Sequence, residues 1–264
     1  AIGIETEGYT HQLYYNYPKT GGYQAISERW AEKLTINYNH NVKRIMPQKD
    51  GTLMIATDKA EYKVKSIVST MPLDLLLKCC SSWIPKSLFS NNEKLVVNPM
   101  LVVSIGIKGI DKEKYTAIYF PEEDFWVNRI SFPGTFSPLN CPSDCYSIQA
   151  EITVPQDKKE EMFSLSDEDI IDHVVSGLSK KNFINGTIIS QNVKRLERSY
   201  VVYTEGYEKY IEKIRSFFKE KNIHLLGRFS YFEYINIDMA LHRSLKLVQE
   251  LSVTKEKNDD IIFE

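Results

Sequence analysis

Ile223-His224-Leu225-Leu226-Gly227-Arg228 predicts a short buried strand that ends at a glycine and an arginine. Tyr231 and Tyr234 follow in a linker, and Asp238 is expected to cap a helix from Met239 to about Leu251. Ligands of open α/β sheets lie beyond the carboxyl ends of strands, and an arginine fork suits a diphosphate. The stretch therefore predicts a ligand-binding edge, although a surface arginine and a routine helix cap also fit it.

The N-terminal part of the chain carries a second pattern of this kind. Gly21 and Gly22 precede a predicted helix over residues 23–34, whose apolar stripe is Ile26, Trp30, Ala31 and Leu34. Glycines at a helix entrance let backbone approach a ligand, and an ordinary loop-to-helix turn is the alternative. Short strands are then predicted at 39–47, 53–57, 62–65 and 66–70.

The middle of the chain predicts a larger sheet. Strands are expected at 100–107, 115–120, 126–131 and 146–153, with one or two more over 187–203, and helices at 73–80, 166–178 and 207–221. Ser166 and the acids after it suit a helix start. The fold class is therefore predicted as α/β (α+β). We expect both chain ends to form a partial nucleotide-binding layer. The middle of the chain is expected to form a larger, mainly antiparallel sheet with helices on one side.

The composition of the chain argues against several classes of function. The net charge of −2 gives no basic face for nucleic acid, which is not expected as a partner. No apolar run reaches the length of a membrane span, and no secretory signal opens the chain. The four cysteines form no disulfide framework, and no histidine has metal-ligand spacing, so reduced thiols in the cytoplasm and no metal site are expected. The chain opens without methionine, which suggests a fragment.

Two charged residues lie inside predicted strands. Arg129 lies in an aromatic segment, Phe125-Trp126-Val127-Asn128-Arg129. Its side chain is expected to face a pocket, and the alternative is a position at the edge of the sheet, facing water. Glu151 lies in an apolar strand and is a candidate structural partner for Arg129.

In order, these pieces resemble the FAD-containing amine-oxidase and protoporphyrinogen-oxidase superfamily, and within it the UDP-galactopyranose mutases. The resemblance covers nearly the whole chain and is carried by order and spacing. Its pieces are Tyr17-Pro18 with Gly21-Gly22, Asn41-Val42-Lys43-Arg44-Ile45, Ser69-Thr70-Met71-Pro72-Leu73, Ser199-Tyr200-Val201-Val202-Tyr203, and Gly227-Arg228-Phe229 with Asp238-Met239.

The resemblance implies a FAD cofactor and its contacts. Implied FAD-binding residues are Gly21, Gly22, Val42, Arg228, Asp238 and Met239, and implied substrate-binding residues are Arg129, Tyr200 and Tyr234, at the diphosphate of a nucleotide sugar. No catalytic residue is implied. Residues 1–72 and 223–253 would form the partial FAD-binding domain, 73–222 the substrate-binding domain, and 254–264 a frayed tail.

The implied activity is that of a mutase, an isomerase of cell-surface polysaccharide (lipopolysaccharide) biosynthesis. The glycine-rich strand-helix unit that holds the FAD adenosine is absent from the sequence and expected upstream, so the chain alone is expected to be inactive. Phe229, Ser230 and Asn236 depart from the mutase pattern. A flavin oxidoreductase acting on an amine or porphyrinogen-like substrate, and a β-rich binding module without cofactor, stay open as alternatives.

Overall fold

The computed structural model describes residues 16–89, 94–110 and 115–256, which form two compact units. The first unit holds the described residues up to Ile36 together with Pro99–Glu197. The second holds Asn37–Asn98 and the chain from Arg198 onward. Helices and mainly antiparallel sheets make up both, so the predicted α+β class is confirmed. Among the described residues no helix has the length and apolarity needed to cross a membrane.

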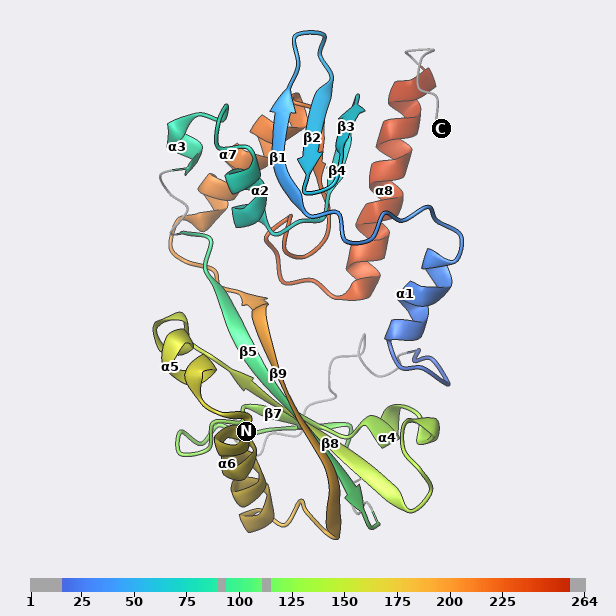
Figure 1. Ribbon diagram of the computed structural model, residues 1–264, viewed down its shortest axis with the longest axis vertical. Helices are drawn as coiled ribbons and strands as arrows, with labels where there is room; N and C mark the ends of the chain where they lie inside the picture. Colours follow the sequence, from blue (N-terminus) through green and yellow to red (C-terminus); the bar gives the residue numbers. More distant parts are fainter. Residues whose placement is uncertain (1–15, 90–93, 111–114, 257–264) are drawn as a thin grey trace, which may run out of the picture. The chain divides into compact units, whose positions relative to one another are not determined.

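The first unit is built on a five-stranded sheet in the order β6-β7-β8-β5-β9 (Figure 1). β5 pairs antiparallel with β8, and alternate side chains of β5 are buried, which explains its apolar, β-branched sequence. Its strands are β5 (Val97–Lys108), β6 (Ala117–Tyr119), β7 (Arg129–Ser131), β8 (Cys145–Thr153) and β9 (Thr187–Val201). Its helices are α1 (Gln24–Ala31), α4 (Pro133–Phe136), η3 (Pro138–Asn140), η4 (Gln156–Lys158), α5 (Lys159–Ser164) and α6 (Asp167–Lys180).

Helix α6 covers the core of this unit. Ile170, Val174 and Leu178 recur along one face and are completely buried. The helix begins as predicted: the Ser166 hydroxyl accepts a hydrogen bond from the Asp169 backbone N–H at 3.0 Å. Three acidic residues in the first turn add a favourable interaction with the helix dipole.

Removing this cap should destabilise the protein measurably. Ser166→Ala is expected to lower the free energy of unfolding by about 1 kcal/mol, because the Asp169 N–H loses its acceptor. Urea denaturation measures the change. Ser176→Ala, at an exposed position of the same helix, is the matched control and should be neutral or slightly stabilising. Equal effects of the two changes would contradict the capping role.

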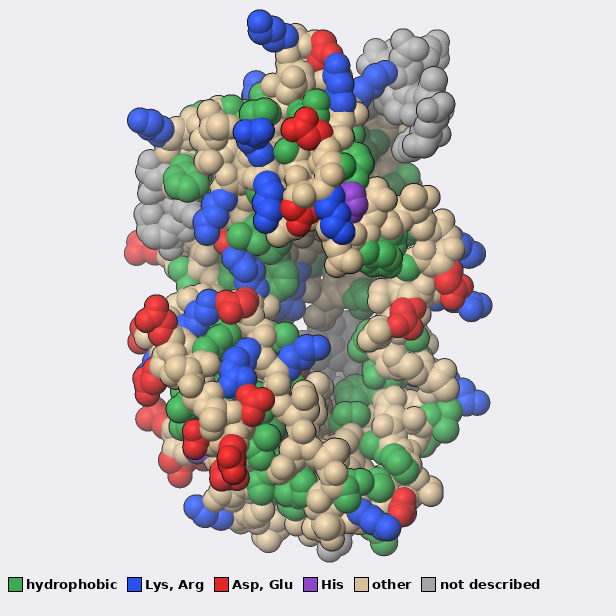
Figure 2. Space-filling model, viewed as in Figure 1, with side chains coloured by type: hydrophobic (Ala, Val, Ile, Leu, Met, Phe, Trp, Pro, Cys, Tyr) green, Lys and Arg blue, Asp and Glu red, His purple; other side chains and the backbone are tan. Residues whose placement is uncertain are grey.

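The second unit combines two small sheets with several helices (Figure 1). β1, β2 and β3 form an antiparallel meander, and β10 pairs parallel with β4. In Figure 2, Lys and Arg side chains are spread over the meander. The elements are β1 (Val42–Pro47), β2 (Leu53–Thr57), β3 (Glu61–Val64), β4 (Ile67–Ser69), α2 (Leu73–Cys79), α3 (Lys86–Phe89), α7 (Tyr207–Glu220), β10 (Ile223–Leu225) and α8 (Ile237–Glu256).

Helix α7 anchors the core of the second unit. Tyr210, Ile211, Ile214 and Phe218 are buried, as predicted for its inward face, and Phe217 is partly buried against the same cluster. The Tyr210 hydroxyl donates to the Leu88 carbonyl oxygen at 2.6 Å, so the one polar atom of this ring is satisfied.

Three sequence predictions need correction. The apolar stripe predicted for residues 23–34 is not buried, and the Trp30 side chain is 52% exposed, because no described element of its unit covers that face. Asp238 is not the cap of the last helix: α8 already includes Ile237, and the Ala240 N–H donates to the Asn236 carbonyl oxygen. The helix continues to Glu256 rather than ending near Leu251. The prediction of one or two strands over 187–203 is confirmed, because this region forms the single strand β9.

Candidate functional site

The segment after β10 is held at both sides by backbone hydrogen bonds. The Leu226 N–H donates to the Ser69 carbonyl oxygen of β4 at 2.9 Å, and the Leu73 N–H at the start of α2 donates to the Phe229 carbonyl oxygen at 3.1 Å. Gly227 has φ +84°, a conformation that side chains disfavour, and no heavy atom lies within 4 Å of a Cβ built on it. The chain therefore turns sharply at the predicted glycine and leaves open space beside it.

Arg228 lies among tyrosine rings. Its guanidinium carbon is 4.4 Å from the ring centroid of Tyr234 and 5.2 Å from that of Tyr200, within cation–π range of both. Its Nη2 donates to the Ser199 carbonyl oxygen at 2.9 Å. Its Nε is buried and has no hydrogen-bond partner among the described residues. The cluster thus holds a fixed cation with an unused donor, which is suited to an anionic ligand.

The two tyrosines are themselves ordered. Their ring centroids are 5.7 Å apart at an interplanar angle of 27°. The Tyr234 backbone N–H donates to the hydroxyl oxygen of Tyr203 at 2.7 Å, and the Tyr203 ring stacks on Tyr207 at 4.6 Å and 11°. Burial, assisted by the nearby Tyr203, raises the pKa of Tyr207 above its ordinary value, so the Tyr207 hydroxyl stays protonated at physiological pH.

A second charged cluster is centred on Glu233, which lies in the same linker. The Glu233 carboxylate accepts from Arg215 Nη2 at 2.8 Å through one oxygen, and from Arg243 through the other. Both guanidinium carbons also lie over the Tyr231 ring, at 3.7 Å for Arg215 and 4.7 Å for Arg243. This cluster ties α7 and α8 to the linker that carries Arg228.

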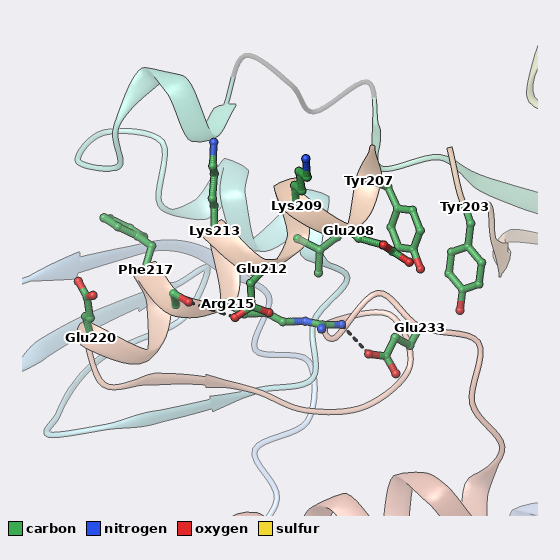
Figure 3. Close-up of a pocket in the computed structure, with 12 residues that line it drawn as sticks. Tyr203, Tyr207, Glu208, Lys209, Glu212, Lys213, Arg215, Phe217, Glu220 and Glu233 are labelled. Atoms are coloured by element: carbon green, nitrogen blue, oxygen red, sulfur yellow. Dashed lines mark hydrogen bonds and ion pairs between the residues drawn. The ribbon is translucent and has the colours of Figure 1, made fainter. Parts of the chain in front are cut away.

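Two cavities adjoin this second cluster. A groove of about 1060 Å³ follows α7, and in Figure 3 Arg215 reaches across it toward Glu233. A smaller cavity of about 360 Å³ lies on the α8 side and is lined by Arg215, Tyr231, Glu233 and Arg243, with further residues of β10 and α8. No three His, Cys, Asp or Glu side chains within residues 16–89, 94–110 and 115–256 group to hold a metal ion.

The other residues of the second unit that were predicted to bind FAD are Val42, Asp238 and Met239, for which no contact with Arg228 is described. Val42 opens β1, and its carbonyl oxygen accepts a weak hydrogen bond from the Cys79 thiol at 3.6 Å. Burial raises the pKa of that thiol, so Cys79 stays protonated. Asp238 and Met239 lie in the first turn of α8, and Met239 is exposed.

Gly21 and Gly22 belong to the first unit. Both have positive φ, +78° and +63°, just before α1 begins. The segment before them is tied to its own unit, because the Ser137 hydroxyl donates to the Lys19 carbonyl oxygen at 2.7 Å and Tyr17 contacts the Phe136 ring. The predicted loop-to-helix turn is confirmed, whereas its contact with a ligand stays a prediction.

Arg129 also belongs to the first unit and forms the ion pair with Glu151 that the sequence suggested. Its Nε donates to one oxygen of Glu151 at 3.0 Å and its Nη2 to the other, a two-point contact across β7 and β8. The Glu151 side chain is 10% exposed and that of Arg129 is 31% exposed. The carboxylate therefore holds the arginine in place, while part of the Arg129 side chain is exposed to solvent.

Comparison with known families identifies the chain. The model of the flavin containing amine oxidoreductase family matches residues 3–243. The chain belongs to this family. Membership implies the FAD cofactor that the sequence predicted. A comparison with curated protein sequences finds no match.

Solved structures share the fold of this amine oxidoreductase chain. A reduced UDP-galactopyranose mutase is 24% identical, with a TM-score of 0.71 over 83% of this chain and 48% of its own. A protein assigned as a protoporphyrinogen oxidase from Exiguobacterium sp. 255-15 is 16% identical, with a TM-score of 0.66 over 85% and 51%. A redesigned putrescine oxidase is 13% identical, with a TM-score of 0.65 over 87% and 53%. The chain thus spans about half the length of the structures it matches.

The residues around Arg228 fit a flavin dinucleotide. FAD carries an anionic diphosphate, and the buried Nε of Arg228 is a donor that lacks an acceptor among the described residues. Gly227 leaves open space in which a ligand could approach the backbone. Tyr203, Arg215, Glu233 and Arg243 were not predicted as site residues, because each alone reads as an ordinary surface or core side chain.

Proposed function

We propose that this chain supplies part of the FAD site of a flavin enzyme, with Arg228 as its main cation. The observation that supports this proposal most directly is the position of the Arg228 guanidinium. It contacts the rings of Tyr200 and Tyr234, and its buried Nε has no acceptor among the described residues. Arg228 would lie against the FAD diphosphate and flavin, because a fixed cation in a partly dry site attracts phosphate strongly. When bound, the flavin supplies the redox or nucleophilic chemistry.

The remaining FAD contacts are proposed from backbone positions. Gly21 and Gly22 would let the chain approach the flavin, and the Val42 backbone would meet the adenine. Asp238 and Met239 lie in the first turn of α8, where N–H groups without helical partners are available to a ring carbonyl.

We propose a nucleotide sugar as the substrate, bound through its diphosphate by Arg129, Tyr200 and Tyr234. Arg129 is preoriented by Glu151, and tyrosine hydroxyls donate to phosphate oxygens. The reaction would be the redox-neutral isomerisation that a reduced flavin performs in a mutase, serving cell-surface polysaccharide synthesis in the cytoplasm. The mutase among the structural neighbours motivates this choice.

A second candidate is hydride removal from an amine or porphyrinogen-like substrate. The family description favours it, because the matching model is that of amine oxidoreductases. In this version Tyr200 and Tyr234 would line an aromatic substrate pocket beside Arg228.

One pair of measurements separates the candidates. We expect the intact enzyme, when reduced and kept free of oxygen, to bind a UDP-sugar in calorimetry and to interconvert its sugar-ring forms without consuming an acceptor. Bleaching of the flavin by an amine, followed by oxygen-dependent turnover, would instead support the oxidoreductase. An intact enzyme without visible flavin absorbance that takes up no added FAD would contradict both and favour a binding module.

A further inference from the structure

Tyr203 lies where β9, α7 and the linker to α8 meet. Its hydroxyl oxygen accepts the Tyr234 backbone N–H at 2.7 Å, a short and direct hydrogen bond. Tyr203 thus bonds to the backbone of a residue whose ring contacts Arg228.

The side chain of Tyr234, which Tyr203 holds through its backbone, is less buried than the linker residues before it. The Tyr234 side chain is 52% exposed, and its ring rests on Arg228 and Tyr200. Few buried contacts fix an exposed linker residue, so a backbone hydrogen bond has a large share in its order. Losing that bond would let the Tyr234 ring, and with it the Arg228 guanidinium, sample other positions.

Tyr203 is in turn fixed by a rigid element. Its ring stacks at 4.6 Å and 11° on Tyr207, the first residue of α7. Figure 3 shows the two rings side by side at the end of the groove. Helix α7 is secured by the fully buried Ile214 and Phe218. The stack therefore connects a packed helix to the exposed Tyr234.

We infer that Tyr203 is a positioning residue for the site around Arg228. This inference rests on the proposed FAD-binding role of that site and deepens it. The ring is held by stacking and the hydroxyl by one hydrogen bond, so substitution with phenylalanine separates the two contributions. The hydroxyl is the part that orders Tyr234.

The test compares two matched variants of the intact enzyme. Tyr203→Phe keeps the stack but removes the acceptor for the Tyr234 N–H, and is expected to weaken FAD binding about 3- to 10-fold, the range of one hydrogen bond. Tyr207→Phe also keeps the stack and removes a hydroxyl that does not bond Tyr234, so its dissociation constant should stay within about twofold of the parent. Quenching of flavin fluorescence gives both constants.

A second readout follows Tyr234 itself without any ligand. In protein labelled with ¹⁵N-tyrosine, Tyr203→Phe should speed hydrogen exchange of the Tyr234 amide about 3- to 10-fold, with the thermal midpoint nearly unchanged. Unchanged exchange or unchanged FAD binding in Tyr203→Phe would overturn the inference. If Arg228→Leu still weakens FAD binding, the proposed function survives that result. If Arg228→Leu has no effect either, the proposed function fails and the inference with it.

Discussion

Arg228→Leu is expected to weaken FAD binding by about 10- to 100-fold, the range for loss of hydrogen bonds to a charged group. The guanidinium is held by the Ser199 carbonyl oxygen and two tyrosine rings, so it is ordered before a ligand arrives. A preordered donor loses little entropy on binding and contributes most of its interaction to affinity. The flavin content of the purified variant, and its dissociation constant for added FAD, measure the effect.

The same change should barely alter folding. Arg228 has a buried Nε without an acceptor among the described residues, so leucine removes an unsatisfied donor together with the cation–π contacts and the hydrogen bond to the Ser199 carbonyl oxygen. A thermal midpoint close to that of the parent therefore accompanies the loss of flavin. Arg29→Leu, which removes an arginine whose side chain is 80% exposed, is the control and should retain full flavin. Normal FAD affinity in Arg228→Leu would contradict the proposed site.

Local signals were sufficient for the elements around this site. The apolar run before Gly227 predicts β10, because a buried strand ends where a glycine permits a positive φ. Amphipathic spacing likewise predicts α7, and Ser166 predicts the start of α6. Each of these patterns depends on residues close together in the chain, so no knowledge of tertiary contacts was needed.

Contacts between segments that are distant in the chain were harder to predict from the sequence. That Tyr200 and Tyr234 both meet Arg228 follows from the pairing of their segments in space, and the sequence grouped them only through a family resemblance. The exposed stripe of α1 shows the same limit, since periodicity predicts a helix without saying what covers its face. The α8 boundary was misplaced because Asp238 is a good cap, yet fits equally well in a first turn.

The cluster of Arg215, Glu233 and Arg243 could not be predicted from the sequence, for a related reason. Its members come from α7, the linker and α8, and no spacing links them. Their side chains are only 21–27% exposed, so the two arginines depend on one carboxylate for most of their charge compensation. Such a shared partner is a point where one substitution affects three elements.

Glu233→Leu is therefore expected to lower the free energy of unfolding by about 2–3 kcal/mol. Breaking a fully buried ion pair by removing one partner costs about 3–5 kcal/mol, and the partial exposure of these side chains reduces that figure. The loss leaves Arg215 and Arg243, which both contact the Tyr231 ring, without their shared counterion, and one buried nitrogen on each already lacks a hydrogen-bond partner among the described residues. Urea denaturation monitored by fluorescence measures the change.

Two further variants decide whether the shared carboxylate is the cause. Glu212→Leu makes the same chemical change at an exposed position of the same groove and should shift stability by less than about 0.5 kcal/mol. Adding Arg243→Leu to Glu233→Leu should recover part of the loss, because it removes one of the two stranded cations. Additive losses in the double variant would mean that packing around Glu233, rather than its charge, stabilises the linker. Recovery would instead show that repulsion between the two arginines is what Glu233 suppresses, and that the fold tolerates their close approach only through it.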